Sequence, residues 1–280
     1  MPLKFTKMHG LGNDFMVIDA IHQTVDLSPQ TIVRLANRHT GVGFDQCLIV
    51  ETDQREDIDF FYRIFNADGQ EVGQCGNGAR CLARFVQKHA LISERRIRVA
   101  THTAMMTLQL NDDNTVTVDM GIPCLHPDEI PIQVKEQSTS YILPLNAGGQ
   151  YTVHAVNVGN PHAVSIVEDI NTAPVTTLGR EISEHPLFPV QANAGFMQIL
   201  SPHRIRLRVY ERGCGETSAC GSGAVAAVVA GRLFYDLAER VHVELPGGEL
   251  IVDWPDVNGA LLLTGPATFV YEGELLPCVS

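Results

Sequence analysis

The 280-residue sequence predicts an α+β fold of two similar halves, each built mostly of antiparallel sheet with few helices. Three observations lead to this prediction. Glu71 to Cys81 ("EVGQCGNGARC") and Glu216 to Ala226 ("ETSACGSGAVA") share Glu, three residues and Cys-Gly-X-Gly-Ala at a constant offset of 145 (216 − 71 = 145; 220 − 75 = 145). Alternation of apolar and polar residues recurs along the chain, which indicates half-buried strands. Two segments with helical character directly follow the repeated motif.

The composition favours a globular protein that acts on a small molecule. Hydrophobic residues make up 45% and charged residues 19%, as in ordinary folded domains. The formal net charge of −12 argues against nucleic-acid and anionic-membrane partners, which require clustered Lys and Arg. We see no signal peptide, and the most apolar stretch, Ala219 to Phe234, is shorter than a membrane span. Seven cysteines without a Cys-X-X-Cys pair indicate a reducing cytoplasm.

Strands are predicted where the period of two is clearest. These segments are Ile205 to Tyr210 ("IRLRVY"), Thr115 to Met120 ("TVTVDM") and Val241 to Leu245 ("VHVEL"). Turn residues such as Pro246 to Gly248 and Asn258–Gly259 separate such segments. We therefore expect most of the sheet to be antiparallel.

Three helices are predicted. After Cys75 an apolar stripe and a charged stripe share one helix, and we expect the charged face to be wet. After Cys220, Ala224 to Ala230 is apolar all round, as expected of a helix enclosed by its own sheet. The third helix, Ser28 to Arg38, starts with an N-cap serine followed by proline. The apolar stripe is Ala79, Leu82, Ala83 and Val86, and the charged one is Arg80, Arg84 and Lys88.

The duplication extends beyond the cysteine motif. "GND" at Gly12 to Asp14 is matched by "GNP" at Gly159 to Pro161, at an offset of 147 (159 − 12 = 147). Two matched motifs at nearly one offset favour internal duplication over chance. We place the boundary in the Pro-rich and polar region Pro123 to Gly149, so that the halves are residues 1–122 and 123–266. The C-terminal strand, residues 267–280, is a candidate to cross back and complete the first half.

The repeated motif suits an anion site with a reactive thiol. Glycines at a helix start allow close approach to a ligand, and the first-turn N–H groups have no partner within the helix. The helix dipole at that point can lower a thiol pKa from about 8.5 toward neutrality. Two such units facing one substrate would place a thiol on either face of a carbon. One thiolate could then remove a proton while the other thiol delivers one, which inverts the centre.

Other interpretations of the cysteines are weaker. A zinc site is not expected, because Cys81 lies six residues past Cys75, about 240° round a helix. A cysteine protease would not explain a second copy, and neither copy has the Lys-Ser/Thr of a Walker loop. A Cys75–Cys220 disulfide would be an inactive oxidised form. We interpret the remaining cysteines as small apolar residues, namely Cys47, Cys81, Cys124, Cys214 and Cys278.

Six motifs in order identify the family that this sequence resembles, and together they cover nearly the whole chain. The sequence resembles the diaminopimelate epimerase family, cofactor-independent isomerases of bacterial lysine and peptidoglycan precursor synthesis. The resemblance implies two α/β halves, each a sheet curled round a central helix, with the active site between them. The motifs are "KMHGLGNDF" (Lys7 to Phe15), "RHTGVGFDQ" (Arg38 to Gln46), "RIFNADGQEVGQCGNGARC" (Arg63 to Cys81), "VGNPHAV" (Val158 to Val164), "ANAGFM" (Ala192 to Met197) and "ERGCGETSACGSGA" (Glu211 to Ala224).

The resemblance also implies roles for individual residues. Cys220 would accept and Cys75 donate the proton when L,L-diaminopimelate becomes the meso isomer, with the roles exchanged in reverse. His162 and Glu211 would hold the α-ammonium and tune the thiols. Helix-terminal N–H groups of Gly76, Asn77, Gly221 and Ser222 would bind the reacting α-carboxylate. The distal amino-acid group would be read by Asn13, Gln46, Asn66, Asn160, Asn193 and Arg212, with Arg212 as a fork for the carboxylate.

Two further residues, Tyr271 and Ser222, bear on the resemblance to the family. Tyr271, in "VYEGE", matches a segment of the family's dimer contact, so a homodimer is expected. Ser222 replaces a threonine that is frequent in the family but keeps its hydroxyl.

Two other functions are compatible with the sequence. The first rival is another cofactor-free racemase, for proline or hydroxyproline, although such a substrate would leave Arg212 without a partner. The second is a non-catalytic thiol sensor or amino-acid-binding protein, which would bind without exchanging an α-proton.

Overall fold

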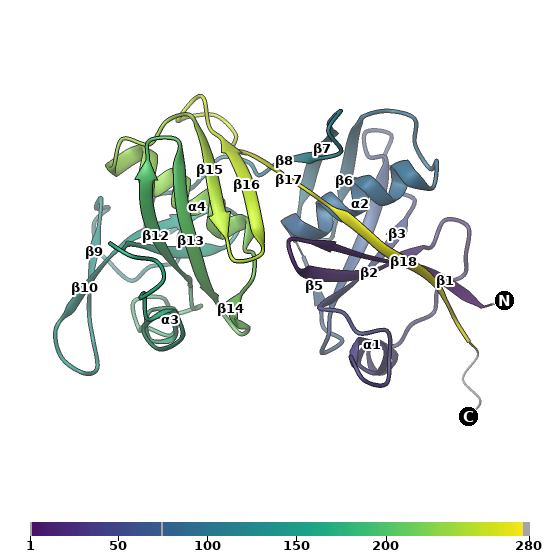
Figure 1. Cartoon of the computed structure of the whole chain (residues 1–280), viewed down its shortest axis with the longest axis horizontal. Helices are drawn as coiled ribbons and strands as arrows, with labels where there is room; N and C mark the ends of the chain where they lie inside the picture. The colour runs from purple at the N-terminus through teal and green to yellow at the C-terminus, as the bar shows by residue number, and fades with distance from the viewer. Residues whose placement is uncertain (1, 74, 277–280) are drawn as a thin grey trace. The chain divides into compact units, whose positions relative to one another are not determined.

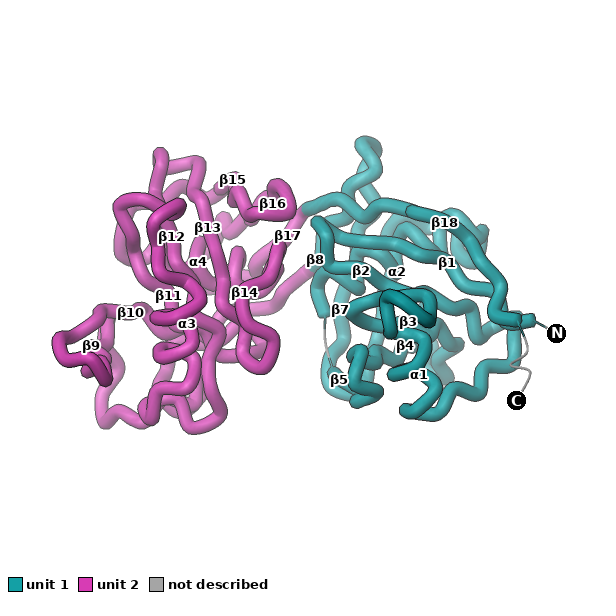
Figure 2. The backbone as a smooth tube through the Cα atoms, turned by 60° about the horizontal axis from the view of Figure 1, so that its bottom comes forward, with its two compact units in different colours: residues 1–118, 265–280 teal, residues 119–264 magenta. Residues whose placement is uncertain are grey.

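The computed structural model describes residues 2–73 and 75–276. The chain forms two compact units: unit 1 comprises residues 1–118 and 265–280, and unit 2 comprises residues 119–264 (Figure 2). The sequence-based boundaries were placed after residues 122 and 266. Cys278 and the rest of 277–280, the end of the expected C-terminal strand, lie outside the described residues. Within the described ranges, none of the helices has the length and apolarity needed to span a membrane.

Unit 1 is a sheet curled round helix α2 (Figure 1). Its strand order is β18-β1-β2-β3-β4-β6-β7-β8, with the short β5 paired to β4. The pairs β2–β3 and β4–β6 are parallel and the other pairs are antiparallel. The elements are β1 (Leu3–Gly10), β2 (Asn13–Asp19), α1 (Pro29–Ala36), β3 (Gln46–Glu51), β4 (Phe60–Asn66), β5 (Glu71–Val72), α2 (Gly76–Lys88), β6 (Arg96–Ala100), β7 (Met105–Leu110), β8 (Val116–Asp119) and β18 (Thr268–Leu275).

Unit 2 repeats this arrangement round helix α4. The order is β9-β10-β11-β12-β13-β15-β16-β17, with β14 paired to β13, and the parallel pairs are β11–β12 and β13–β15. The elements are β9 (Tyr141–Pro144), β10 (Gln150–Asn157), β11 (Pro161–Ile166), α3 (Val175–Ser183), β12 (Asn193–Ser201), β13 (Arg204–Glu211), β14 (Gly215–Thr217), α4 (Gly221–Phe234), β15 (Arg240–Leu245), β16 (Gly248–Asp253) and β17 (Leu262–Gly265).

Matching registers confirm the predicted pair of similar halves. In the first parallel pair of unit 1, Phe15 lies opposite Gln46, and in unit 2 His162 lies opposite Asn193. Both members are displaced by 147 residues (162 − 15 = 147; 193 − 46 = 147). The candidate site residues Gln46 and Asn193 therefore occupy equivalent strand positions in the two halves.

The central helices owe their burial to their sequences. In α4, Ala224 to Ala230 is fully buried, as predicted. In α2 the apolar stripe is likewise fully buried, but the expectation that Arg80 lies on a wet face was wrong, because Arg80 has no exposed surface. Its guanidinium donates to Asn77 Oδ1 at 2.8 Å and to the carbonyl oxygen of Pro266 at 3.2 Å. Helical spacing alone could not show that the segment preceding β18 lies close to this side chain.

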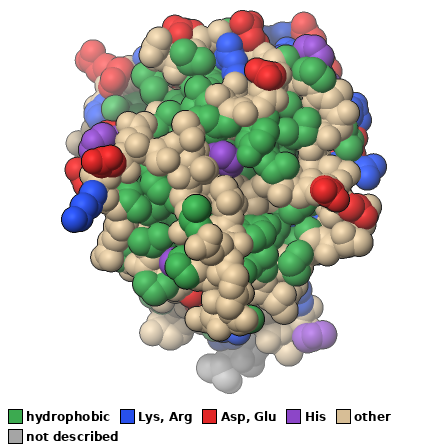
Figure 3. Space-filling model, turned by 90° about the vertical axis from the view of Figure 1, so that its left-hand side faces the viewer, with side chains coloured by type: hydrophobic (Ala, Val, Ile, Leu, Met, Phe, Trp, Pro, Cys, Tyr) green, Lys and Arg blue, Asp and Glu red, His purple; other side chains and the backbone are tan. Residues whose placement is uncertain are grey.

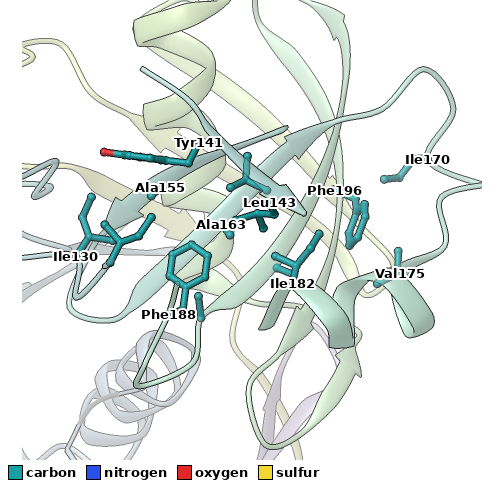
Figure 4. Packing of buried hydrophobic residues seen from close by; sticks show 14 residues of the cluster. Ile130, Tyr141, Leu143, Ala155, Ala163, Ile170, Val175, Ile182, Phe188 and Phe196 are labelled. Carbon is teal, nitrogen blue, oxygen red and sulfur yellow. The ribbon is translucent and has the colours of Figure 1, made fainter. Parts of the chain in front are cut away.

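Helices α1 and α3 occupy corresponding places in the two repeats. Helix α1 begins as predicted, with the Ser28 side chain accepting from the Thr31 amide at 3.2 Å and Pro29 in the first turn. Helix α3 was not predicted, since its cap, Pro174, makes no side-chain hydrogen bond. In the view of Figure 4, Ile182 of α3 lies between Phe188 and Phe196 in the core of unit 2.

The face of the molecule in Figure 3 alternates apolar and polar patches, with charged side chains mostly toward its rim.

Candidate active site

Cys75 caps the central helix of unit 1. Its backbone is extended (φ −152°, ψ 109°), and its Sγ accepts from the Gly78 amide at 3.4 Å. Gly76 and Asn77 form the first helical positions, so their amides are not used by the helix itself. Cys75 is partly exposed. The first motif therefore places a half-buried thiol beside a helix N-terminus, as the sequence predicted.

Two asparagines surround the Cys75 thiol. Asn13 Oδ1 lies 3.9 Å from Cys75 Sγ and accepts from Asn77 Nδ2 at 3.2 Å. Asn13 Nδ2 donates to Asp45 Oδ2 at 2.9 Å, which fixes the orientation of the Asn13 amide. Asn77 is 5% exposed, and its Oδ1 accepts from Arg80. The side chain of Asn77 thus positions Asn13, while its backbone amide is the group suited to an anion.

A second polar pair of unit 1 lies on neighbouring strands. Gln46 begins β3 opposite Asn66 at the end of β4, and Gln46 Nε2 donates to Asn66 Oδ1 at 2.8 Å. Gln46 Oε1 is buried without a hydrogen-bond partner among the described residues. Because an unpartnered buried acceptor is costly, this oxygen is suited to a donor on a ligand.

Cys220 repeats the cap in unit 2, in a drier setting. Its Sγ accepts from the Gly223 amide at 3.4 Å and lies 3.6 Å from Ser222 Oγ. Cys220 is only 3% exposed. Gly221 and Ser222 form the first turn of α4 and present their amides as Gly76 and Asn77 do in unit 1.

A buried carboxylate lies against the Cys220 thiol. Glu211, at the end of β13, is hydrogen-bonded to Cys220, and the Thr217 hydroxyl donates to Glu211 Oε1. Burial raises the pKa of the Glu211 carboxyl, and the two hydrogen bonds oppose that rise. Burial also raises the pKa of the Cys220 thiol well above its usual range, with the Glu211 charge adding to the effect. At Cys220 the pKa is thus raised and not lowered toward neutrality, because burial and the Glu211 charge outweigh the hydrogen bonds with Ser222 and the Gly223 amide.

His162 belongs to a third polar cluster, which is buried in unit 2. His162 Nε2 lies 3.0 Å from Asn160 Oδ1 and 3.3 Å from Asn193 Nδ2, while Asn193 Oδ1 accepts from the Arg212 amide at 3.0 Å. His162 has no exposed surface, and its Nδ1 has no partner among the described residues. Burial, followed by the positive charge of Arg212, lowers the pKa of His162 to about 3. This imidazole is neutral at physiological pH.

The structure distributes the sequence-predicted residues over the two units. Unit 1 brings together Cys75, Asn13 and Asn77 directly, and joins Gln46 to Asn66. Unit 2 joins Cys220 with Glu211, and His162 with Asn193. Arg212 is exposed and donates through Nη1 to the Val190 carbonyl at 3.1 Å. The Asn160 side chain contacts the His162 ring at 3.0 Å.

Three residues hydrogen-bond to the candidate site residues, although no role was assigned to them there from the sequence: Asp45, Arg80 and Thr217. Asp45 orients Asn13, and Thr217 holds the Glu211 carboxylate. A signal for Arg80 was present, because the repeat places Val225 at its position in the second motif (80 + 145 = 225). One motif has a charged residue at this position and the other an apolar one, although the motifs otherwise match, so the two halves differ here.

Comparison with known proteins agrees with this architecture. The chain resembles a phenazine biosynthesis protein of the PhzF family from Bacillus anthracis (TM-score 0.68, 16% identity, 99% of this chain and 100% of that one). It also resembles a probable proline racemase from Agrobacterium radiobacter (TM-score 0.67, 14% identity, 98% and 93%). At these identities the likeness defines the fold alone: duplicated halves, each a sheet round a central helix.

The sequence comparison is more specific. The profile of the family described as diaminopimelate epimerase matches residues 5–125 and 154–270. A diaminopimelate epimerase from Legionella pneumophila strain Philadelphia 1 is 59% identical over 276 residues, covering 99% of this chain and all of that protein. The chain belongs to the diaminopimelate epimerase family.

Proposed function

We propose that this protein interconverts L,L- and meso-diaminopimelate without a cofactor, using Cys75 and Cys220 as its acid–base pair. The main support is that family membership extends over almost the full length of the chain, together with two cysteine-capped helix N-termini, one in each half. As an epimerase of this kind, it would supply a precursor for lysine and for peptidoglycan.

The reaction requires proton transfer on both faces of one carbon. A thiolate removes the α-proton and the opposite thiol returns a proton to the other face, so the sulfur that begins as base ends as acid. In the L,L-to-meso direction we assign Cys220 as base and Cys75 as acid, and the roles exchange in the reverse direction. The amides of Gly76, Asn77, Gly221 and Ser222 would stabilise the negative charge that develops at the α-carboxylate.

The environment of Cys220 suggests how substrate would activate it. Glu211 is a buried acidic group beside Cys220, and burial raises the pKa of both groups. An α-ammonium bound at Glu211 would add positive charge there and so favour ionisation of the thiol. His162, neutral and buried, would act by hydrogen bonding in this arrangement.

The distal end of the substrate would meet the amides assigned above. Gln46 Oε1, buried and unpartnered among the described residues, is suited to accept from an ammonium, and Arg212 to pair with a carboxylate. Asn66 would hold the Gln46 side chain in place. In unit 2, Asn160 and Asn193, which both contact His162, are the residues proposed to recognise the distal amino-acid group.

The decisive experiment measures α-hydrogen exchange and epimerisation of L,L-diaminopimelate in heavy water by NMR, with no added cofactor. We expect turnover, and we expect Cys75→Ala and Cys220→Ala each to lower the rate of inversion by at least about a hundredfold. Cys124→Ala, which removes a thiol elsewhere, is the control and should leave the rate unchanged.

Two outcomes would contradict the proposal. Inversion of proline but not of diaminopimelate would assign the protein to the rival racemases. Binding without α-deuterium incorporation would indicate a sensor or binding protein. We further propose a cytoplasmic homodimer with Tyr271 in the contact; Tyr271 is 46% exposed on β18 and therefore accessible to a partner.

A further inference from the structure

Arg80 is a buried cation without a carboxylate partner among the described residues. It has no exposed surface, and desolvation lowers its pKa. Its Nη2 donates to Asn77 Oδ1, its Nε donates to the Pro266 carbonyl, and its Nη1 has no hydrogen-bond partner in the described part of the chain. A buried charge in this condition is unfavourable unless it interacts with a negative group.

The fold leaves room for this side chain. A Cβ added at Gly10, at the end of β1, would lie 3.1 Å from Arg80 Nη2 and 3.5 Å from the Asn77 Cβ. The guanidinium is therefore packed between β1, the first turn of α2 and the segment before β18. Its position is set by three parts of unit 1.

The acidic groups that act on Arg80 are the thiols of Cys81 and Cys75. Cys81 is fully buried, and burial raises its pKa far above the physiological range, so Cys81 remains a neutral thiol. Cys75 is partly exposed, and the Gly78 amide already donates to its sulfur. Cys75 is thus the group that can carry the compensating negative charge.

We propose that Arg80 is a positioning residue whose charge favours the thiolate of Cys75 from a buried place that its hydrogen bond to Asn77 fixes at the first turn of α2. The Asn13 oxygen that faces this sulfur accepts from the thiol at 3.9 Å and so opposes ionisation, which leaves the Arg80 charge as the favourable influence. Unit 2 has the opposite arrangement, with Val225 in the position of Arg80 and the Glu211 carboxylate beside Cys220. The inference rests on the proposed function only in treating Cys75 as a reacting group.

The test measures the rate at which iodoacetamide alkylates Cys75 in substrate-free protein, with each modified cysteine located by peptide mass spectrometry. Because only thiolate reacts, the rate reports ionisation. We expect Arg80→Met to slow alkylation of Cys75 about tenfold, the effect of losing one nearby opposite charge. Arg84→Met, one turn further along the same helix, is the matched control and should react at the wild-type rate.

A second variant separates charge from packing. Arg80→Lys keeps the charge and loses the fork, so Cys75 should stay within about threefold of the wild-type rate. Arg80→Met should fold, because replacing a buried ion by an apolar side chain is often neutral and the repeat carries valine there. If Arg80→Met does not fold, Arg80→Gln takes its place, because glutamine removes the charge and keeps a donor toward Asn77. We expect Arg80→Gln to slow alkylation of Cys75 to the same extent.

The inference is overturned if folded Arg80→Met or Arg80→Gln is alkylated at Cys75 at the wild-type rate, or if Arg80→Lys loses as much reactivity as the neutral variant. A purely structural Arg80 would change melting temperature without a selective change at Cys75. A protein that gives the expected alkylation pattern but does not epimerise diaminopimelate would refute the proposed function and leave this inference standing.

Discussion

At the scale of single residues, the two cysteines share a local geometry but differ in their surroundings. Each sulfur accepts from an amide three residues later at 3.4 Å. The differences come from positions where the repeat does not match. Asn66 corresponds to Glu211 (66 + 145 = 211), and Arg80 corresponds to Val225. These two positions give Cys220 a neighbouring carboxylate, and they give the first turn of α2 a buried cation that donates to Asn77.

Protonation of His162 predicts a pH-dependent stability. In the folded protein its pKa is about 3, whereas an unfolded histidine titrates near 6.5, so below pH 6.5 the unfolded chain binds a proton that the folded chain does not. This contribution to stability is complete above about pH 6.5 and is lost as the pH falls. We expect it to cost about 2 kcal/mol at pH 5 relative to pH 7.

Urea unfolding of the wild type and of His162→Gln at pH 5, 6 and 7 measures this effect. The variant lacks the titrating ring, so its free energy of unfolding should fall by about 2 kcal/mol less between pH 7 and pH 5 than that of the wild type. Other histidines contribute equally to both proteins. Equal pH dependence in the two would show that His162 is protonated within the fold.

At the scale of elements, sequence periodicity was sufficient where local chemistry decides the structure. Helix α1 was predicted because Ser28 and Pro29 form a complete start signal, and α4 because a helix apolar all round must be enclosed. Helix α3 was missed because its cap makes no side-chain bond, although shifting α1 by 146 residues gives Val175 (29 + 146 = 175). The burial of Arg80 could not be predicted, since it depends on Pro266, 186 residues away.

In the candidate site, too, features set by local sequence were predicted and features set by tertiary packing were not. Repetition and resemblance placed both cysteines at helix starts, and the structure has them there as N-caps. The raised pKa of Cys220 escaped prediction, because it depends on how deeply the tertiary fold buries that sulfur. The hydrogen bonds of Asp45 to Asn13 and of Thr217 to Glu211 could not be predicted either, because they depend on which segments lie next to each other in the fold.

The glycines of the two helix starts should differ in tolerance. A Cβ at Gly223 would lie 2.9 Å from Val209 Cγ2 and 3.2 Å from Cys220 Sγ, whereas a Cβ at Gly78 would meet Leu48 Cδ2 at 3.3 Å. Val209 is buried in β13 and has little room to yield. We expect Gly223→Ala to destabilise the protein by about 1–3 kcal/mol through overpacking. Gly78→Ala should change stability by less than about 1 kcal/mol, because better helix propensity offsets the tighter contact.

Thermal unfolding and initial rates of epimerisation compare the two variants. Gly223→Ala should also lower the rate, because relief of the contact displaces the Cys220 sulfur. Equal melting temperatures for both variants would contradict the inference that α4 is packed more tightly at Gly223 than α2 is at Gly78.

At the scale of the whole molecule, duplication gives one chain two similar units, each with a cysteine that caps its central helix. Unit 1 contains both ends of the sequence, since β18 pairs with β1, and unit 2 is continuous. The equal strand order means that each unit presents its cysteine from the same position, at the start of the helix inside its sheet. A two-base reaction can therefore arise from duplication followed by divergence of a few side chains.

This organisation predicts the outcome of mixing inactive variants. In the proposed homodimer each chain supplies both of its own thiols, so Cys75→Ala mixed with Cys220→Ala should show no activity beyond that of the separate proteins. Subunits should be exchanged by mild denaturation and refolding, and sedimentation velocity should confirm dimers in the mixture. A wild-type chain treated identically controls for recovery. Restored activity of up to about a quarter of the wild-type value, as expected if half the chains form mixed dimers with one intact pair each, would show that the two thiols of an active site come from different chains.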